Sequence, residues 1–264
     1  MMEDEFYFEA YKRYREKLKQ TSWFAEPVSY DWLTLPSEIS FEWFLYHKML
    51  NEHIRQLANA VNQLLRDTVK LSTWANLACE YTDEEKLYLI TEFIGHIAAI
   101  TLNLPYVIRS RFIFSVAHLC HQANRIKDAN WKDTFPNDKS INFKTMEKFS
   151  KGWDAYGKFK QSLTKLSNDK FNVETTEFRN KFHHQLPVLI EIGLSSLLSR
   201  KKNASGSVSY GLGGIKPLSL NKIVPLLEEQ HSAALLCFSS YQELIEEQIN
   251  QIFSHKAWVS GLHS

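Results

Sequence analysis

The sequence predicts an all-α protein built as a helical bundle, and three observations support this fold class. Apolar residues recur at spacings of three and four along most of the 264 residues. Only 9 glycines and 7 prolines interrupt the chain, and no convincing alternation of apolar and polar residues indicates a strand. About seven helices joined by short turns are therefore expected. They span roughly residues 4–20, 38–78, 82–104, 105–128, 141–167, 174–200 and 218–255.

Start and stop signals support these boundaries. Pro36 and Ser37 precede the second helix. Thr82 and Glu85 have the spacing of a capping box, in which each side chain accepts a hydrogen bond from the other residue's backbone. Pro105 is expected to end the third helix and to begin the fourth, because proline is tolerated in a first helical turn.

The segments between the later helices are expected to be loops. Residues 130–138, NWKDTFPND, separate the fourth and fifth helices, and the Ser/Gly-rich residues 203–214 are expected to form a mobile surface loop. The expected organisation is an N-terminal helical extension, residues 1–80, packed on a helical bundle of residues 81–264. Together they are expected to form one compact unit.

Composition limits the classes of function. The chain has 31 basic and 30 acidic residues, so attraction to a nucleic acid would depend on local patches. The start, MMEDEFYF, lacks the basic and apolar regions of a signal peptide. No apolar run of about 18 residues is evident, so no membrane partner is expected. Three cysteines without CxxC spacing predict free buried thiols and a soluble protein of the reducing cytoplasm.

Residues 178–184, FRNKFHH, are the strongest candidate for a functional site. With about 100° per residue, a helix places Arg179, Asn180, His183 and His184 on an arc of about 140°. The expected helix continues well beyond the motif with apolar residues on every side, which predicts burial all round. The polar arc is therefore expected to open onto a second apolar contact, made by another helix or by another copy of the chain.

The residue types in this arc suit chemistry on a phosphodiester. Arginine matches phosphate oxygens with a rigid fork of donors, and histidine, with a pKa of about 6.5, exchanges protons near neutral pH. Asparagine can orient an imidazole or hold a ribose hydroxyl. The set fits attack by an RNA 2′-hydroxyl on the adjacent phosphate, with no metal or cofactor. A polar first turn of an ordinary helix, with only local hydrogen bonds, accounts equally well for the spacing.

The stretch Arg179-Asn180-Lys181-Phe182-His183-His184 resembles the signature of the HEPN superfamily, named for its higher eukaryotic and prokaryotic nucleotide-binding members. In that family an arginine, a polar residue and a histidine open the last helix of an α-bundle. The resemblance implies a HEPN-like helical core and a metal-independent endoribonuclease that leaves 2′,3′-cyclic phosphate ends. It further implies a homodimer whose two motifs face one cleft, in a defence, toxin–antitoxin or RNA-processing role.

Carried over residue by residue, Arg179 matches the motif arginine, Asn180 the polar position and His184 the histidine. His183 lies one turn from Arg179 and is the other candidate for the proton transfer. Lys181 lies within the motif and is expected to contact RNA.

Further lysines are expected to bind RNA. Lys144, Lys148 and Lys151 share one face of the expected helix 141–167, and such a face would make binding sensitive to salt. A solvated face of an amphipathic helix is the alternative interpretation of these three residues.

Two other functions stay open. One is a catalytically inactive helical dimer of the same fold that binds RNA, a nucleotide or a protein partner such as an antitoxin. The other is a metal-dependent helical-bundle enzyme that uses His96, His118 and His121. Packed core histidines explain these three residues more simply, so no metal site is predicted.

Overall fold

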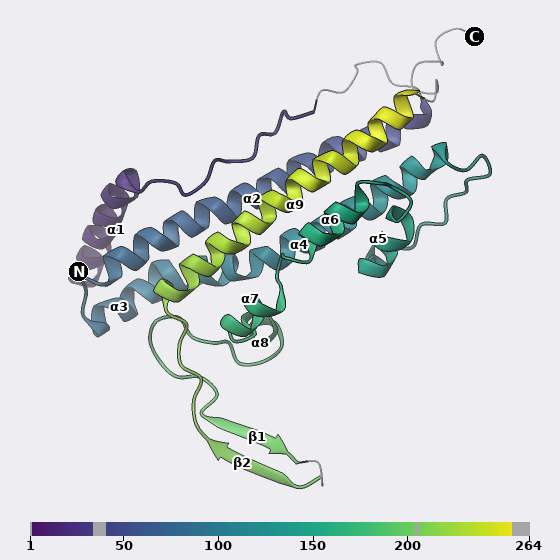
Figure 1. Ribbon diagram of the computed structural model, residues 1–264. Helices are drawn as coiled ribbons and strands as arrows, with labels where there is room; N and C mark the ends of the chain where they lie inside the picture. The colour runs from purple at the N-terminus through teal and green to yellow at the C-terminus, as the bar shows by residue number, and fades with distance from the viewer. Residues whose placement is uncertain (1, 34–40, 204–205, 255–264) are drawn as a thin grey trace. The chain divides into compact units, whose positions relative to one another are not determined.

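The computed structural model describes residues 2–33, 41–203 and 206–254, which form a mostly helical protein, as predicted (Figure 1). The helices are α1 (Met2–Gln20), α2 (Phe44–Ala78), α3 (Asp83–Leu89), α4 (Gly95–Ala123), α5 (Phe143–Ser150), α6 (Tyr156–Leu163), α7 (Asp169–Glu174), α8 (Phe178–His184) and α9 (Leu220–Ser254). An antiparallel hairpin of β1 (Leu198–Lys202) and β2 (Val208–Leu212) is an addition that the sequence pattern did not predict.

The chain divides into two compact units, each assembled from three separate stretches. Unit 1 comprises Met1–Glu26, Leu64–Leu104 and Asn168–Glu229, whereas unit 2 comprises Pro27–Gln63, Pro105–Ser167 and Gln230–Ser264. Helices α2, α4 and α9 each contribute residues to both units. This division differs from the expected boundary near residue 80, which stays a prediction.

Unit 1 is organised around a stack of three aromatic rings. The Trp74 ring on α2 lies parallel to the Tyr14 ring on α1, with 4.3 Å between centroids and 4° between planes. Phe93 lies 5.2 Å from Trp74 at 11°. Because large aromatic side chains bury 150–250 Å² each, this stack holds α1 in the core, and Glu80 pairs with Arg13 and Lys17 of α1.

The entry into α4 combines a confirmed prediction with an unexpected turn. The capping box is present: Glu85 N donates to Thr82 Oγ1 at 3.3 Å, and Thr82 N donates to Glu85 Oε2 at 2.8 Å. The chain then makes one π-helical segment, Ile90–Ile94. A Cβ atom at Gly95 would lie only 2.9 Å from the Ile90 carbonyl oxygen, so the wide turn requires a residue without a side chain.

Pro105 does not end a helix, contrary to the prediction. It lies inside α4, which runs without interruption from Gly95 to Ala123. The missing N–H weakens the helix at this point, but Leu102 on one side and Ile108 on the other are almost fully buried. Packing therefore stabilises the helix through the proline.

One helical stretch of the described residues has the length of a membrane span, and the expectation of no membrane partner stays a prediction. Among the residues that the structure describes, the helical stretch Asp83–Ile126 is long and apolar enough to cross a membrane, and a window of 18 residues within it has a mean hydropathy of 1.5. Length and composition alone give this match, and the core helix of a soluble protein matches equally well.

Unit 2 has a buried network of polar side chains. Tyr46 Oη donates to Gln248 Oε1 at 2.8 Å, and Gln248 Nε2 lies 3.0 Å from Cys120 Sγ. Burial raises the pKa of the Cys120 thiol to about 12. The three cysteines are free, as predicted, although Cys79 is exposed and only Cys120 and Cys237 are buried.

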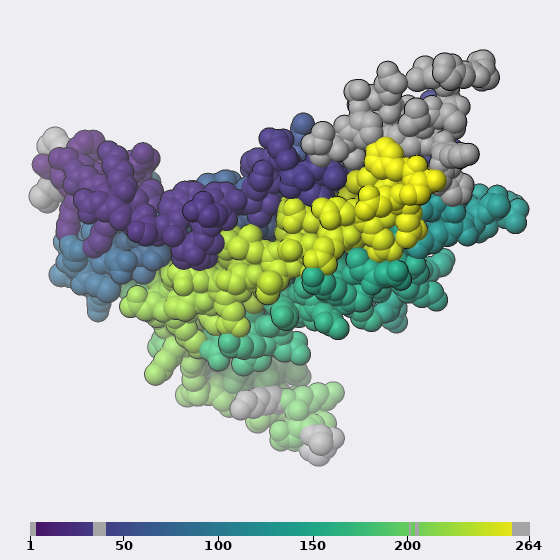
Figure 2. All heavy atoms as spheres, turned by 45° about the horizontal axis from the view of Figure 1, so that its top comes forward, coloured from purple at the N-terminus to yellow at the C-terminus, as the bar shows by residue number. Residues whose placement is uncertain are grey.

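Residues 27–33 lie beside the middle of α9 (Figure 2). The Trp32 ring meets the Phe238 ring edge-on at 6.3 Å. Asn62 of α2 holds the backbone of Val28 through two hydrogen bonds, at 2.7 and 2.9 Å. Both contacts lie within unit 2.

Two histidines of unit 2, the buried His231 and the half-buried His53, predict that acid destabilises the protein. Burial lowers the pKa of His231 to about 4, and burial together with His118 lowers the pKa of His53 to about 4. The unfolded chain binds protons below pH of about 6.5, so between roughly pH 6.5 and 4 it holds more protons than the folded protein. The free energy of unfolding must therefore fall as pH falls through this window.

For His231 alone we expect a loss of about 1–3 kcal/mol between pH 7.5 and 4.5, measured by urea unfolding. The variant His231→Leu should lose correspondingly less over the same interval. Equal losses in the variant and the original protein would contradict this role for His231.

Candidate functional site

The motif lies on α8, a helix of only seven residues, and not on the long helix expected over 174–200. Thr176 and Glu177 join α7 to α8 in the left-handed region, with φ of 57° and 53°. The Glu177 N–H donates to the Asn172 carbonyl at 2.7 Å and closes this turn. Gln185 is extended and ends α8. Pro187 explains the stop, because a proline disfavours helical backbone at the preceding residue.

The chain after α8 is irregular and then forms the hairpin, which extends from the segments that connect α8 to α9 (Figure 1). Val188 and Ile190 are buried and anchor this connection, whereas Leu194 and Leu197 are 55% and 59% exposed. The prediction of a helix buried on every side is therefore wrong. The expected loop 203–214 is partly strand β2, and residues 204–205 of that loop lie outside the described residues.

The short helix nevertheless keeps the motif side chains on one arc, since residues 179–184 are all helical. Asn180, His183 and His184 are exposed, and Arg179 is half-buried. Phe178, which is 2% exposed, anchors the helix and stacks on Phe182 at 5.5 Å. The polar arc is thus presented to solvent from a helix that is fixed by one buried ring.

Asn103 of α4 orients one of the two histidines, and both residues belong to unit 1. His183 Nε2 lies 3.2 Å from Asn103 Oδ1, while Asn103 Nδ2 donates to the Ala99 carbonyl at 2.8 Å. Because the amide oxygen can only accept, Nε2 of His183 carries the proton in this arrangement and its Nδ1 faces away from the bond. The sequence contains no signal for Asn103, which lies 80 residues from His183.

His184 differs from His183 in its environment. Its ring lies 6.2 Å from the His183 ring, and its side chain is exposed. The hydrogen bond to Asn103 orients His183, and both imidazoles are accessible to a substrate. Lys181, the remaining charged residue of the motif, is half-buried on the same helix.

The lysines expected to share one helical face are divided by a break in the helix. The segment 151–155 separates α5 from α6, so the expected helix 141–167 is wrong as a single element. Lys148 and Lys151 line a pocket of 520 Å³ in unit 2. Lys144 is exposed on α5 and does not line this pocket.

Two lysines that sequence reasoning missed, Lys127 and Lys132, complete the pocket. None of these four lysines is in an ion pair among the residues that the structure describes, whereas Lys158 and Lys160 of the same unit pair with Glu243 and Glu147. The pocket therefore has an excess of positive charge that is suited to phosphate groups.

Hydrogen bonds and ring contacts hold three residues that line the pocket: the buried His121, the half-buried Trp131 and the exposed Lys127. The Trp131 indole N–H donates to the His121 carbonyl at 3.1 Å, and His121 Nε2 lies 3.0 Å from Asp133 Oδ1. Burial lowers the pKa of His121, with a smaller contribution from Lys148, while Asp133 opposes the shift. Lys127 lies over the Trp153 ring at 3.6 Å and donates to the Gly152 carbonyl at 2.6 Å.

The structure gives the alternative metal site no support. His118 and His121 each face one carboxylate, with 3.4 Å between His118 Nε2 and Asp138 Oδ1. Within residues 2–33, 41–203 and 206–254, His96, His118 and His121 do not form a group that could hold a metal ion, and no other three ligating side chains do so.

No family model, no curated protein and no solved structure matches this chain. The resemblance to the HEPN superfamily therefore depends on the residues of α8 alone.

Proposed function

We propose that this protein is a metal-independent endoribonuclease of the HEPN type, built on a HEPN-like helical core. One observation carries the proposal: Arg179, Asn180, His183 and His184 occupy one solvent-facing arc of α8. An arginine beside imidazoles in this arrangement can stabilise a phosphorane-like charge and move a proton without a metal ion.

The proposed roles follow from the environment of each side chain. Arg179 binds the scissile phosphate through its planar fork of donors. His184 is accessible and exchanges the proton of the 2′-hydroxyl or of the leaving oxygen. Asn180 orients one of these groups. His183, with Nε2 engaged by Asn103, presents Nδ1 as its remaining acceptor and is the second candidate for the proton transfer.

Lysines of each unit are separately proposed to bind RNA phosphates. Lys181 lies on the motif helix, and Lys148 and Lys151 belong to the pocket completed by Lys127 and Lys132. Phosphate contacts of this kind release counterions, so affinity should fall steeply with salt. Lys144, which has no ion pair among the described residues, is the remaining proposed contact.

Apolar side chains beside the motif support a homodimer. Phe182, Leu186 and Leu189 are 43%, 68% and 39% exposed, and contiguous exposed apolar surface often marks an interface. A second copy that covered these residues would exclude water from the polar arc and strengthen its interaction with a phosphate. A cytoplasmic role in defence, in RNA processing or as a toxin held by an antitoxin partner fits this activity.

The proposal predicts that the purified protein cuts RNA in excess EDTA and leaves 2′,3′-cyclic phosphate ends, which mass spectrometry of the products detects. The matched control is the same RNA with a single 2′-deoxy substitution at the cleaved position, which should resist cutting because the attacking hydroxyl is absent. Loss of cutting in EDTA, or cutting at the deoxy position, would refute the proposed mechanism.

A second candidate function is RNA or nucleotide binding without cleavage. The four lysines of the unit 2 pocket, which form no ion pair with any described residue, favour this function. The same assay separates the two functions. Retained RNA affinity in the absence of any cleavage would support the binding protein, and binding of a protein partner is a third form of that alternative.

A further inference from the structure

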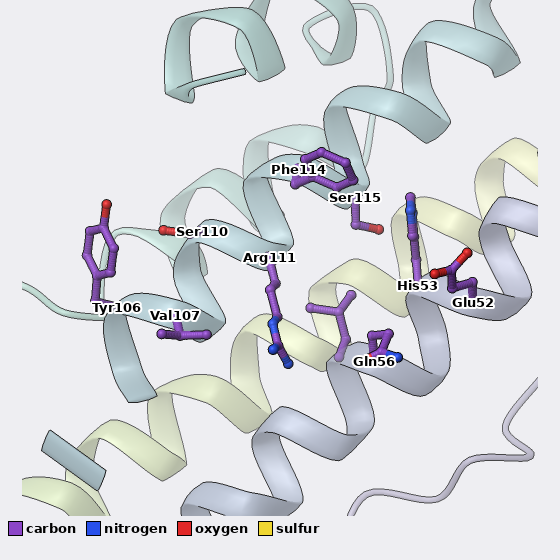
Figure 3. A pocket seen from close by; sticks show the side chains of 10 residues that line it. Glu52, His53, Gln56, Tyr106, Val107, Ser110, Arg111, Phe114 and Ser115 are labelled. Atoms are coloured by element: carbon purple, nitrogen blue, oxygen red, sulfur yellow. The ribbon is translucent and has the colours of Figure 1, made fainter. Parts of the chain in front are cut away.

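A second pocket of unit 2 lies between α2 and α4 and has a volume of 450 Å³ (Figure 3). It shares no lining residue with the lysine pocket. Its size falls within the range of about 300–1,000 Å³ that is typical of small-molecule sites. No residue of the α8 motif and no lysine proposed to bind RNA lines this pocket.

One wall of this pocket is apolar. Leu57 of α2 is 1% exposed, and Val107 and Phe114 of α4 face the same space. The Phe114 ring lies 4.4 Å from the His118 ring and 5.8 Å from the His53 ring, so it is held between aromatic neighbours. Apolar surface of this kind favours the hydrocarbon part of a ligand, because binding removes apolar area of both from water.

Arg111 is the one arginine or lysine among the residues that line this pocket. Arg111 extends from α4 towards Gln56 of α2 (Figure 3). It is exposed, and among the described residues it is in no ion pair or hydrogen bond. A guanidinium beside apolar surface interacts with an anion more strongly than one surrounded by water, because the local dielectric constant is lower.

The rest of the lining limits the ligand to one negative charge. His53 contributes no charge near neutral pH, since burial holds its pKa at about 4. Its Nδ1 is buried without a hydrogen-bond partner among the described residues. Glu52 lies beyond Gln56 from Arg111 (Figure 3) and repels a second anionic group. Charge thus favours an anion only at the Arg111 end.

We propose that this pocket binds a small amphipathic molecule with one anionic group, such as a medium-chain or aromatic carboxylate. The anionic group pairs with Arg111, and the hydrocarbon body packs against Leu57, Val107 and Phe114. This inference goes beyond the ribonuclease proposal and does not depend on it.

The test uses the full chain and the fluorescent probe 8-anilinonaphthalene-1-sulfonate, which combines an aromatic body with one sulfonate. We expect saturable binding with one site per chain. Arg111→Gln should weaken it about tenfold or more, the loss expected for one charge-assisted hydrogen bond. Arg55→Gln is the matched control, because Arg55 is an exposed arginine of α2 that does not line the pocket.

A pocket-filling variant and a competition experiment test the proposal independently of Arg111→Gln. Val107→Trp fills the pocket and should abolish binding of the probe, with circular dichroism to verify the fold. Decanoate should displace the probe at concentrations about tenfold lower than decan-1-ol, which has the same chain without the charge. Binding that is equal in Arg111→Gln and Arg55→Gln, or several probe molecules bound per chain, would overturn the proposal, whatever the outcome of the RNA assay.

Discussion

Replacing His184 with alanine is expected to lower the rate of RNA cleavage by about 10²–10⁴-fold, the usual contribution of a positioned general acid or base. Replacing Arg179 with alanine should lower it by about 10²–10³-fold, the range for loss of one group that stabilises developing charge. The affinity for uncut RNA should change little in His184→Ala, because this variant keeps the lysines that are proposed to contact the phosphates. Single-turnover cleavage and filter binding on the same RNA measure the two quantities.

His96→Ala is the matched control, because His96 is an exposed histidine of unit 1 that lies outside α8. This variant should cut RNA at the original rate. A rate that collapses in His183→Ala but persists in His184→Ala would exchange the roles of the two histidines. Unchanged cleavage in both Arg179→Ala and His184→Ala would remove α8 as the catalytic element and leave the binding function.

The largest loss of stability is expected from Trp74→Ala. Trp74 is 1% exposed and lies between the Tyr14 and Phe93 rings, so its removal leaves a cavity that two stacked neighbours face. Truncation of a core tryptophan lowers the free energy of unfolding by about 3–5 kcal/mol. Urea unfolding followed by far-ultraviolet circular dichroism measures the change.

Trp23 supplies the control for this substitution. It also belongs to unit 1 but is 49% exposed, so Trp23→Ala should change the free energy of unfolding by no more than about 0.5 kcal/mol. Similar losses for the two tryptophans would show that the aromatic stack does not hold α1 in the core of unit 1.

Elements governed by short-range interactions could be predicted from the sequence. The bounds of α1 and α9 agree with the prediction to within two residues, because their apolar periodicity is long and regular. The capping box was predictable for a similar reason: Thr82 and Glu85 are three residues apart, and their hydrogen bonds depend on little else. The clustering of the motif side chains on one arc likewise needs only the helical repeat.

The effects of Pro105 and Pro187 on the helices could not be predicted from the sequence. Pro105 lies within α4, whereas α8 ends before Pro187. Each proline removes the same N–H and restricts the preceding residue in the same way. Buried neighbours on both sides stabilise the helix around Pro105, but the residues after Pro187 alternate between buried and exposed positions in an irregular segment. Propensity alone cannot distinguish these cases, because their difference is one of packing.

The amino-acid sequence was sufficient to predict the helical composition, the capped start of α3 and the shared arc of Arg179, Asn180, His183 and His184. The sequence was not sufficient to predict which distant residues contact the side chains of the candidate sites. Asn103 reaches His183 across 80 residues of chain, and Lys127 and Lys132 join Lys148 and Lys151 through a loop and a helix end. Contacts of this kind arise when distant segments pack together, and no periodicity in the sequence records which segments will meet.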